Sequence, residues 1–160
     1  MKSTEFDYTF LFSPIQNQYT QVDLFNHMDH RQDSFNIMID DTSLSIHGFP
    51  NVPSLSADLI DLAIAIHAVD RLIKRHNNRP LSFSIKVPIR NYDHFVENNV
   101  AETLTKILNW YTSDYWQFNF SKRSVWGRDV EMQPQFPWRN LPDKDVEVAL
   151  WSGGLDSLSG

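Results

Sequence analysis

Three stretches of the chain alternate apolar and polar residues with a period of two, which is the pattern of half-buried β-strands. Residues 35–46 alternate on either side of the turn-forming pair Asp40-Asp41, which predicts a hairpin. The stretch 81–89 (LSFSIKVPI) gives the clearest single strand, and 115–120 (YWQFNF) repeats its pattern. Pro88 cannot donate a backbone hydrogen bond, so we expect it at a sheet edge or at a strand end.

Two other stretches carry the spacing of amphipathic helices. Residues 54–76 open with Ser54 and Ser56 as possible caps, continue with acidic side chains and end with basic ones, which suits the helix dipole. A second, shorter helix is expected at 101–111. The apolar residues expected to face the core are Leu59, Leu62, Ala63, Ile66, Val69 and Ile73 in the first helix and Leu104, Ile107, Leu108 and Tyr111 in the second.

The order of these elements predicts an α+β domain over residues 1–127, built from short antiparallel strands and two helices. Residues 128–145 contain three prolines and no sustained periodicity, which is typical of a linker. After it, the alternation of residues 146–150 (VEVAL) begins a strand that leads directly into a glycine-rich loop. Residues 146–160 are therefore expected to start a second domain.

Composition narrows the classes of partner and chemistry. The 20 Asp and Glu exceed the 14 Lys and Arg, giving a net charge of −6, so direct nucleic-acid binding is not expected. The chain has no cysteine, which excludes disulfides, thiolate zinc sites and cysteine nucleophiles within it. No window approaches the roughly 18 apolar residues of a membrane span. A cytoplasmic protein without a membrane partner is expected.

The last nine residues, SGGLDSLSG, carry a phosphate-binding pattern. Gly153 and Gly154 lack a Cβ and can adopt positive φ, so the backbone can form a nest of N–H donors around phosphate oxygens. Ser152 and Ser157 add hydroxyl donors, and Asp156 could orient the loop or help to hold Mg²⁺. The loop matches neither the Walker A nor the GxGxxG pattern. A plain polar turn after the strand is the less favoured alternative.

Residues 152–157 resemble the SGGxDS motif of the PP-loop ATP pyrophosphatases. The resemblance implies that residues 146–160 begin an α/β, Rossmann-like PP-loop domain and that ATP and Mg²⁺ are its ligands. It also implies an ATP pyrophosphate-binding role for Ser152, Gly153, Gly154, Asp156 and Ser157. In that family a substrate oxygen attacks the α-phosphorus, which yields an adenylated intermediate and free pyrophosphate.

The order of the long helix, the 81–89 strand, the aromatic strand and the loop is similar to that of QueC-like (7-cyano-7-deazaguanine synthase-like) proteins of anti-phage defence loci, such as the QatC group. This resemblance implies an ATP-dependent, AMP-forming C–N ligase that adenylates a 7-deazaguanine-type carboxylate. The product would be amidated or passed to a protein partner from the same locus.

We expect the chain to be the N-terminal portion of such an enzyme and inactive by itself, because the remaining PP-loop strands and the cysteine zinc site of the deazaguanine synthases would lie further on. The alternative is a non-catalytic, partner-binding domain of a larger defence protein. No catalytic residue and no metal ligand is assigned from the sequence.

Three further groups of residues could carry a function, but for each we favour a structural interpretation. His27, Asp29, His30 and Asp33 are metal-ligand types, but their spacing fits no metal motif and a solvated loop is expected. Asp70 is expected to pair with Lys74 on the helix surface rather than to act with Arg71 in recognition, and His67 to pack half-buried. An aromatic cluster could stack a purine base, although its alternation favours a core face; it comprises Trp110, Tyr111, Tyr115, Trp116, Phe118 and Phe120.

Overall fold

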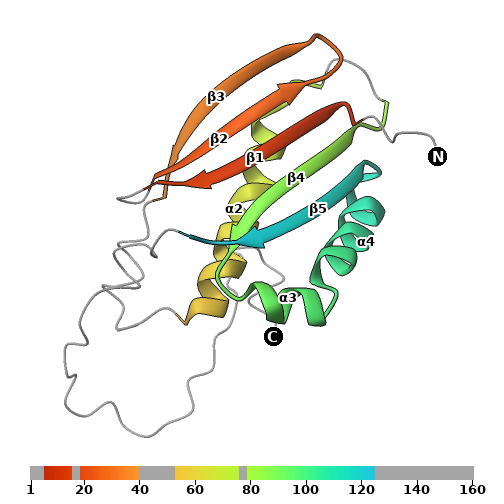
Figure 1. Ribbon diagram of the computed structural model, residues 1–160. Helices are drawn as coiled ribbons and strands as arrows, with labels where there is room; N and C mark the ends of the chain where they lie inside the picture. The colour runs from red at the N-terminus through yellow and green to blue at the C-terminus, as the bar shows by residue number, and fades with distance from the viewer. Residues whose placement is uncertain (1–5, 16–18, 40–52, 76–78, 125–160) are drawn as a thin grey trace, which may run out of the picture.

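The computed structural model describes residues 6–15, 19–39, 53–75 and 79–124, and these form an α+β unit (Figure 1). Five strands make one mixed sheet, and three helices lie on one of its faces. The elements are β1 (Tyr8–Pro14), β2 (Tyr19–Asn26), β3 (Arg31–Met38), α2 (Ser54–Leu72), β4 (Ser82–Ile89), α3 (Tyr92–Glu97), α4 (Val100–Thr112) and β5 (Tyr115–Lys122). The α+β class expected for this part of the chain is confirmed.

The sheet has the strand order β3-β2-β1-β4-β5, in which β1, β2 and β3 are antiparallel neighbours. The β4 strand pairs parallel with both β1 and β5, so the expectation of antiparallel strands alone is wrong. The cause is the connection between the strands: α2 precedes β4, and α3 with α4 precedes β5. A helix that crosses back over the sheet returns the chain to the same end, which makes the next strand parallel.

Most of the expected elements are present, with differences at the N-terminal side. The strands predicted at 81–89 and 115–120 are β4 and β5, and the two predicted helices are α2 and α4. The strands β1 and β2 and the short helix α3 were not predicted. The first arm of the predicted hairpin lies in β3 as far as Met38, but its partner is β2, and the second arm lies outside the described residues.

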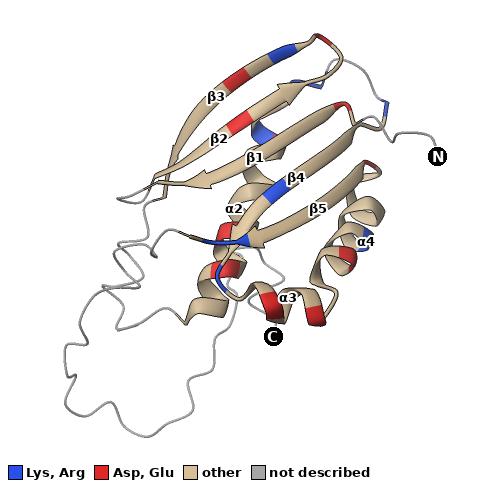
Figure 2. Cartoon of the chain, viewed as in Figure 1, with Lys and Arg blue, Asp and Glu red and all other residues tan. Residues whose placement is uncertain are grey.

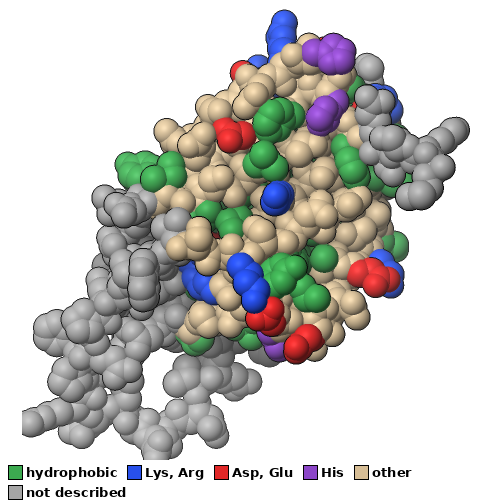
Figure 3. All heavy atoms as spheres, in the orientation of Figure 1, with side chains coloured by type: hydrophobic (Ala, Val, Ile, Leu, Met, Phe, Trp, Pro, Cys, Tyr) green, Lys and Arg blue, Asp and Glu red, His purple; other side chains and the backbone are tan. Residues whose placement is uncertain are grey.

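The core lies between the helices and one face of the sheet. Rows of apolar side chains cross the strands in register, and one row joins Phe10 of β1, Ile85 of β4 and Phe118 of β5. These side chains are 0%, 0% and 5% exposed. The opposite face of the sheet carries no helix (Figure 1), and its surface consists largely of uncharged polar side chains and backbone (Figure 3).

The buried face of α2 is rotated from the one that its apolar residues predict. Leu62, Val69 and Ile73 are buried as expected, but Leu59 is 55% exposed and Ala63 is exposed. Asp58, one position earlier, is 0% exposed because its carboxylate is fully hydrogen-bonded beneath the helix. Anchoring Asp58 inward turns its neighbour outward, since adjacent helical residues point about 100° apart.

The apolar stripe expected on α4 is divided between two faces. Leu104 and Leu108 pack against the core, whereas Ile107 and Tyr111 are 53% and 78% exposed. Together with Trp110, which is 84% exposed, they leave an apolar patch on the helix surface. We call Ile107, Trp110 and Tyr111 the α4 patch.

Candidate functional site

The carboxyl ends of the three parallel strands meet at one edge of the sheet, which is the place where open α/β sheets bind ligands. There β1 ends at Pro14, β4 at Ile89 and β5 at Lys122. Figure 2 shows Lys and Arg at this edge, over the ends of β4 and β5, with Asp and Glu of the adjoining helices beside them. We call it the carboxyl edge.

A fully buried carboxylate anchors the carboxyl edge to α2. The two oxygens of Asp58 accept hydrogen bonds from the backbone N–H groups of Arg90 and Asn91, both at 2.9 Å. They also accept from the Arg90 guanidinium at 3.0 Å and from the Asn91 side-chain amide at 2.8 Å. A buried charge is tolerated when its lone pairs are satisfied in this way. Asp58 therefore fixes the turn after β4 and has a structural role.

A second carboxylate joins two guanidinium groups at the same edge. Asp61 accepts a hydrogen bond from Arg90 Nη1 at 2.6 Å and from Arg123 Nη1 at 2.8 Å. The Asp61, Arg90 and Arg123 side chains are 12%, 13% and 7% exposed, so this network is shielded from water. The Arg123 backbone N–H also donates to the Ile89 carbonyl at 3.0 Å. Arg123 is thus held at a fixed place beside the end of β4.

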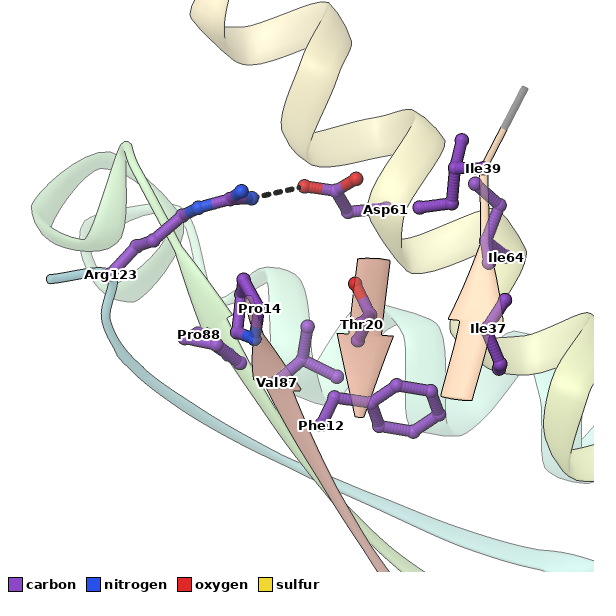
Figure 4. A pocket seen from close by; sticks show the side chains of 10 residues that line it. All are labelled: Phe12, Pro14, Thr20, Ile37, Ile39, Asp61, Ile64, Val87, Pro88 and Arg123. Atoms are coloured by element: carbon purple, nitrogen blue, oxygen red, sulfur yellow. Dashed lines mark hydrogen bonds and ion pairs between the residues drawn. The ribbon is translucent and has the colours of Figure 1, made fainter. Parts of the chain in front are cut away.

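A small gap lies between α2 and the sheet at this edge (Figure 4). Apolar side chains surround it, including Phe12, Ile37 and Val87, and the ion pair between Asp61 and Arg123 lies at its rim. Its volume is about 20 Å³, which is enough for roughly one water molecule. This gap is a packing defect and cannot admit a metabolite.

A larger hollow opens on the helix-free side of the same edge, with a volume of about 310 Å³. The pairing of β1 with β4 ends at Leu11 and Lys86, although β1 continues beside β2, and β4 beside β5. Pro88 lies beyond this point and has no N–H to extend the pairing, which confirms the expected strand end. The hollow is lined by Leu11, Phe12, Ser13, Pro14, Lys86, Pro88, Ser121, Lys122, Arg123 and Ser124. We call it the carboxyl-edge hollow.

Ion pairs also stabilise the opposite edge of the sheet, where the parallel strands β1, β4 and β5 begin. Asp114 is 2% exposed and binds the Arg75 guanidinium at 2.6 and 3.2 Å and the Leu81 N–H at 2.9 Å. The hydrogen bond to Asp114 raises the pKa of Arg75 above its ordinary value. Partial burial raises the pKa of Asp7, but hydrogen bonds from Ser82 and Arg79 outweigh it and leave that pKa below its ordinary value. These ion pairs therefore have a structural role.

The residues singled out in the sequence fall into different places. Ser152, Gly153, Gly154, Asp156 and Ser157 lie outside the described residues, as do the linker and the expected second domain. His27, Asp29 and His30 lie in the exposed turn between β2 and β3, where His27 hydrogen-bonds to Thr9 at 2.9 Å. Within the described ranges, no three His, Asp or Glu side chains are grouped closely enough to hold a metal ion.

The aromatic cluster is split by the alternation of β5. Trp116 and Phe118 are buried at 3% and 5% exposure, which confirms the core interpretation for these two residues. Tyr115 is 63% exposed and points to the helix-free face. His67 is exposed on α2, so the expectation that it packs half-buried is wrong.

Sequence reasoning missed the residues that organise the carboxyl edge. From the sequence, Asp58 and Asp61 are only acidic residues near the start of the helix that suit its dipole, and no role is predicted for Arg90 or Arg123. A buried aspartate on a helix is visible in the sequence only as a polar residue that interrupts an apolar face. That signal becomes meaningful once its partner 32 residues away is known.

Comparison of the chain with protein-family models, with curated proteins and with solved structures finds no match. Among the described residues, no helix combines the length and the apolar character needed to cross a membrane.

Proposed function

We propose that this chain belongs to an ATP-dependent, AMP-forming enzyme of the PP-loop class, for which residues 6–124 form an accessory α+β domain. The observation that carries the proposal is the sequence of residues 152–157, SGGLDS, directly after the apolar run of residues 146–151. With average residue frequencies, such a match in 160 positions arises by chance on the order of twice in ten thousand chains. The proposed substrate is a 7-deazaguanine-type carboxylate, and the proposed setting is phage defence in the cytoplasm.

The loop sequence supports a specific division of roles. The N–H groups around Gly153 and Gly154 would hold the β,γ-pyrophosphate, with the Ser152 and Ser157 hydroxyls as further donors. Asp156 cannot approach phosphate directly without repulsion, so its role is to orient the loop or to bind Mg²⁺. Bound ATP would supply the leaving pyrophosphate and an electrophilic α-phosphorus for the substrate carboxylate.

The α+β fold of the described residues is consistent with an accessory domain. Within the described residues, one sheet and three helices enclose a single apolar core, as expected for a folding unit. The small gap beneath α2 admits nothing larger than water, and no group of metal ligands occurs in the described residues. The residues proposed to bind ATP belong to the loop, so we assign catalysis to the loop and to the PP-loop domain that would follow it.

The test is pyrophosphate release by the complete protein with ATP and Mg²⁺. We expect Asp156→Ala or Ser157→Ala to lower the rate at least about 100-fold, the loss typical when a group that stabilises developing charge is removed. Ser159→Ala, a serine three residues beyond Asp156 and outside the motif, is the matched control and should retain the rate. Unchanged release in the Asp156 and Ser157 variants would contradict the assignment.

A second candidate function is favoured by the α4 patch. Trp110 and Tyr111 are 84% and 78% exposed on a helix that otherwise packs against β5, and exposed aromatic side chains are enriched in protein interfaces. On this alternative, the domain binds a protein encoded in the same locus and contributes no catalysis itself.

This alternative is tested by calorimetric titration of the protein with each purified product of the neighbouring genes. Trp110→Ser/Tyr111→Ser should weaken binding at least about tenfold, because truncating a central interface aromatic costs more than about 1.4 kcal/mol. Lys106→Gln, on the same helix and paired with Glu102 at the surface, is the control and should bind normally. A partner that binds the double variant at full affinity does not use this patch.

A further inference from the structure

We propose that the outer edge of β5 is a self-association surface, at which a second copy of this chain adds its own β5 in antiparallel orientation. The sheet would then continue across a two-fold axis from one copy into the other. β5 is the last strand of the sheet, with β4 on one side and, among the described residues, no strand on the other (Figure 1). This inference is independent of the proposed ATP chemistry.

The hydrogen-bond pattern of β5 shows which of its backbone groups face outward. The Tyr115 N–H donates to the Leu81 carbonyl at 2.8 Å, on the side of β4, and the two strands are parallel along their whole pairing. Because alternate residues of such a strand turn their N–H and C=O groups to the same neighbour, the odd-numbered residues face β4 and the even-numbered ones face outward. Phe118, Phe120 and Lys122 therefore present backbone donors and acceptors at the edge, where another strand can pair with them.

The first outward N–H of the strand is already occupied. The Trp116 N–H donates to Asn109 Oδ1 of α4 at 2.7 Å, which closes the start of the edge. Within the described part of the chain, no such cap is found on the N–H groups of Phe118, Phe120 and Lys122. The open length of the edge therefore runs from Phe118 to Lys122.

The two edges of the sheet differ in charge, and the difference favours β5 for pairing. Charged side chains on an edge strand oppose its pairing with another chain. The other edge strand, β3, carries Arg31 and Asp33, which are both exposed. In β5 the single charged residue is Lys122, at the last position, and its Nζ lies 3.0 Å from an Asp93 oxygen of α3. A strand can thus cover the centre of β5 without burying a charge.

A second copy fits this edge because its own β5 is an uncharged strand with the same open length. Centring the two-fold axis on Phe120 places Phe118 of each copy opposite the partner's Lys122. All the outward N–H and C=O groups from Phe118 to Lys122 are then paired, and both Trp116 N–H groups keep their bond to Asn109. Contacts of this isologous kind are the commonest way in which identical chains associate.

The side chains of the strand agree with this register on both faces of the sheet. Phe120 is only half-buried, although its ring centre lies 5.5 Å from that of Phe95 in the core, and its open side would meet the partner's Phe120. On the helix-free face, Asn119 would lie opposite the partner's Ser121, which is a pair of uncharged polar side chains. Directly opposite side chains lie close enough to interact, so these two pairs contribute to the contact.

Amide hydrogen exchange of the 160-residue chain, followed by NMR at increasing protein concentration, tests the inference without any substitution. We expect exchange at Phe118, Phe120 and Lys122 to slow at least about threefold between about 50 µM and about 1 mM, since a small interface binds in this range. The Trp116 N–H, bound by Asn109, is the internal reference and should exchange at the same rate throughout. Sedimentation velocity over the same range should show monomer converting to dimer.

Substitutions on the helix-free face test the register. Asn119→Glu/Ser121→Glu places like charges opposite each other across the axis and should weaken the dimer about tenfold, because two such pairs form. Asn119→Glu/Ser121→Lys makes the opposing charges unlike and should restore it. The control Gln32→Glu/Asn36→Glu adds the same charge as the first variant at exposed positions of β3 and should associate as the parent does.

Every other outcome overturns the inference. A chain that stays monomeric at about 1 mM, or exchange at Phe118 and Phe120 that does not depend on concentration, means that the edge does not pair with a second copy. A dimer that persists in Asn119→Glu/Ser121→Glu uses another surface, such as the α4 patch. Equal loss in the β3 control assigns the effect to net charge, and failure of Asn119→Glu/Ser121→Lys to restore the dimer refutes the two-fold register. Circular dichroism checks that each variant is folded, and if one is not, the exchange measurement on the parent decides.

Discussion

Replacing Asp58 by alanine should lower the free energy of unfolding by about 3–5 kcal/mol, the range measured when one partner of a buried ion pair is removed. The side chain is 0% exposed and accepts four hydrogen bonds from Arg90 and Asn91. Without it, two backbone N–H groups lose their acceptor, and the Arg90 guanidinium, itself 13% exposed, loses a carboxylate partner. Urea denaturation followed by circular dichroism at 222 nm measures the change.

Two comparisons separate the buried network from a general effect of charge. Asp93→Ala removes a carboxylate at the same edge, but Asp93 is 74% exposed and pairs with Lys122 at the surface, so the loss should stay below about 1 kcal/mol. Asp58→Asn keeps the side-chain volume and one oxygen acceptor and should fall between the two alanine variants. If Asp58→Ala and Asp93→Ala cost the same, the hydrogen-bond network does not anchor α2.

The long elements of the fold could be predicted because their signals are local. The apolar spacing of α2 and the alternation of β4 and β5 each lie within one continuous stretch, and each element was found within four residues of its observed ends. The β1 strand also alternates, with Tyr8, Phe10 and Phe12 buried and Thr9 and Leu11 on the other face. That alternation is not among the three stretches from which strands were predicted, and neither β1 nor β2 was predicted.

Strand direction could not be predicted from the same patterns. Parallel and antiparallel strands with one buried face alternate in the same way, and only the connections distinguish them. The prediction of antiparallel strands for the whole domain therefore fails at β4, where α2 precedes the strand and α3 with α4 follows it. The order of the elements, strand then helix then strand, was the available signal for parallel pairing.

The carboxyl edge was beyond prediction for a different reason. Its organising contacts join residues far apart in sequence: Asp58 with Arg90, and Asp61 with Arg123 across 62 positions. Periodicity describes which face of an element is apolar, and it contains no information on which polar residue meets which. The proposed ATP-binding loop is the reverse case, because its evidence lies in six consecutive residues, which fall outside the described residues.

Replacing Phe83 by alanine should destabilise the fold by about 3–5 kcal/mol, as expected for truncating a fully buried aromatic side chain. Phe83 is 1% exposed and lies opposite Tyr8 on β1 and Trp116 on β5, so it packs between two parallel neighbours. Its ring centre is 6.0 Å from that of Tyr8 and 4.9 Å from that of Trp116. Phe83→Leu leaves a smaller cavity and should cost roughly half as much.

Replacing Phe83 by alanine also tests the parallel register of β4 and β5. In a double-mutant cycle with Trp116→Leu, we expect a coupling free energy of about 0.5–1.5 kcal/mol between Phe83 and Trp116, the value typical of a close aromatic pair. Phe25, on the helix-free face of β2, is the control, because its β1 partner in the register is Thr9 and it should not couple to Trp116. An antiparallel β4–β5 pair would place a different β5 residue opposite Phe83, so zero coupling to Trp116 would contradict the observed topology.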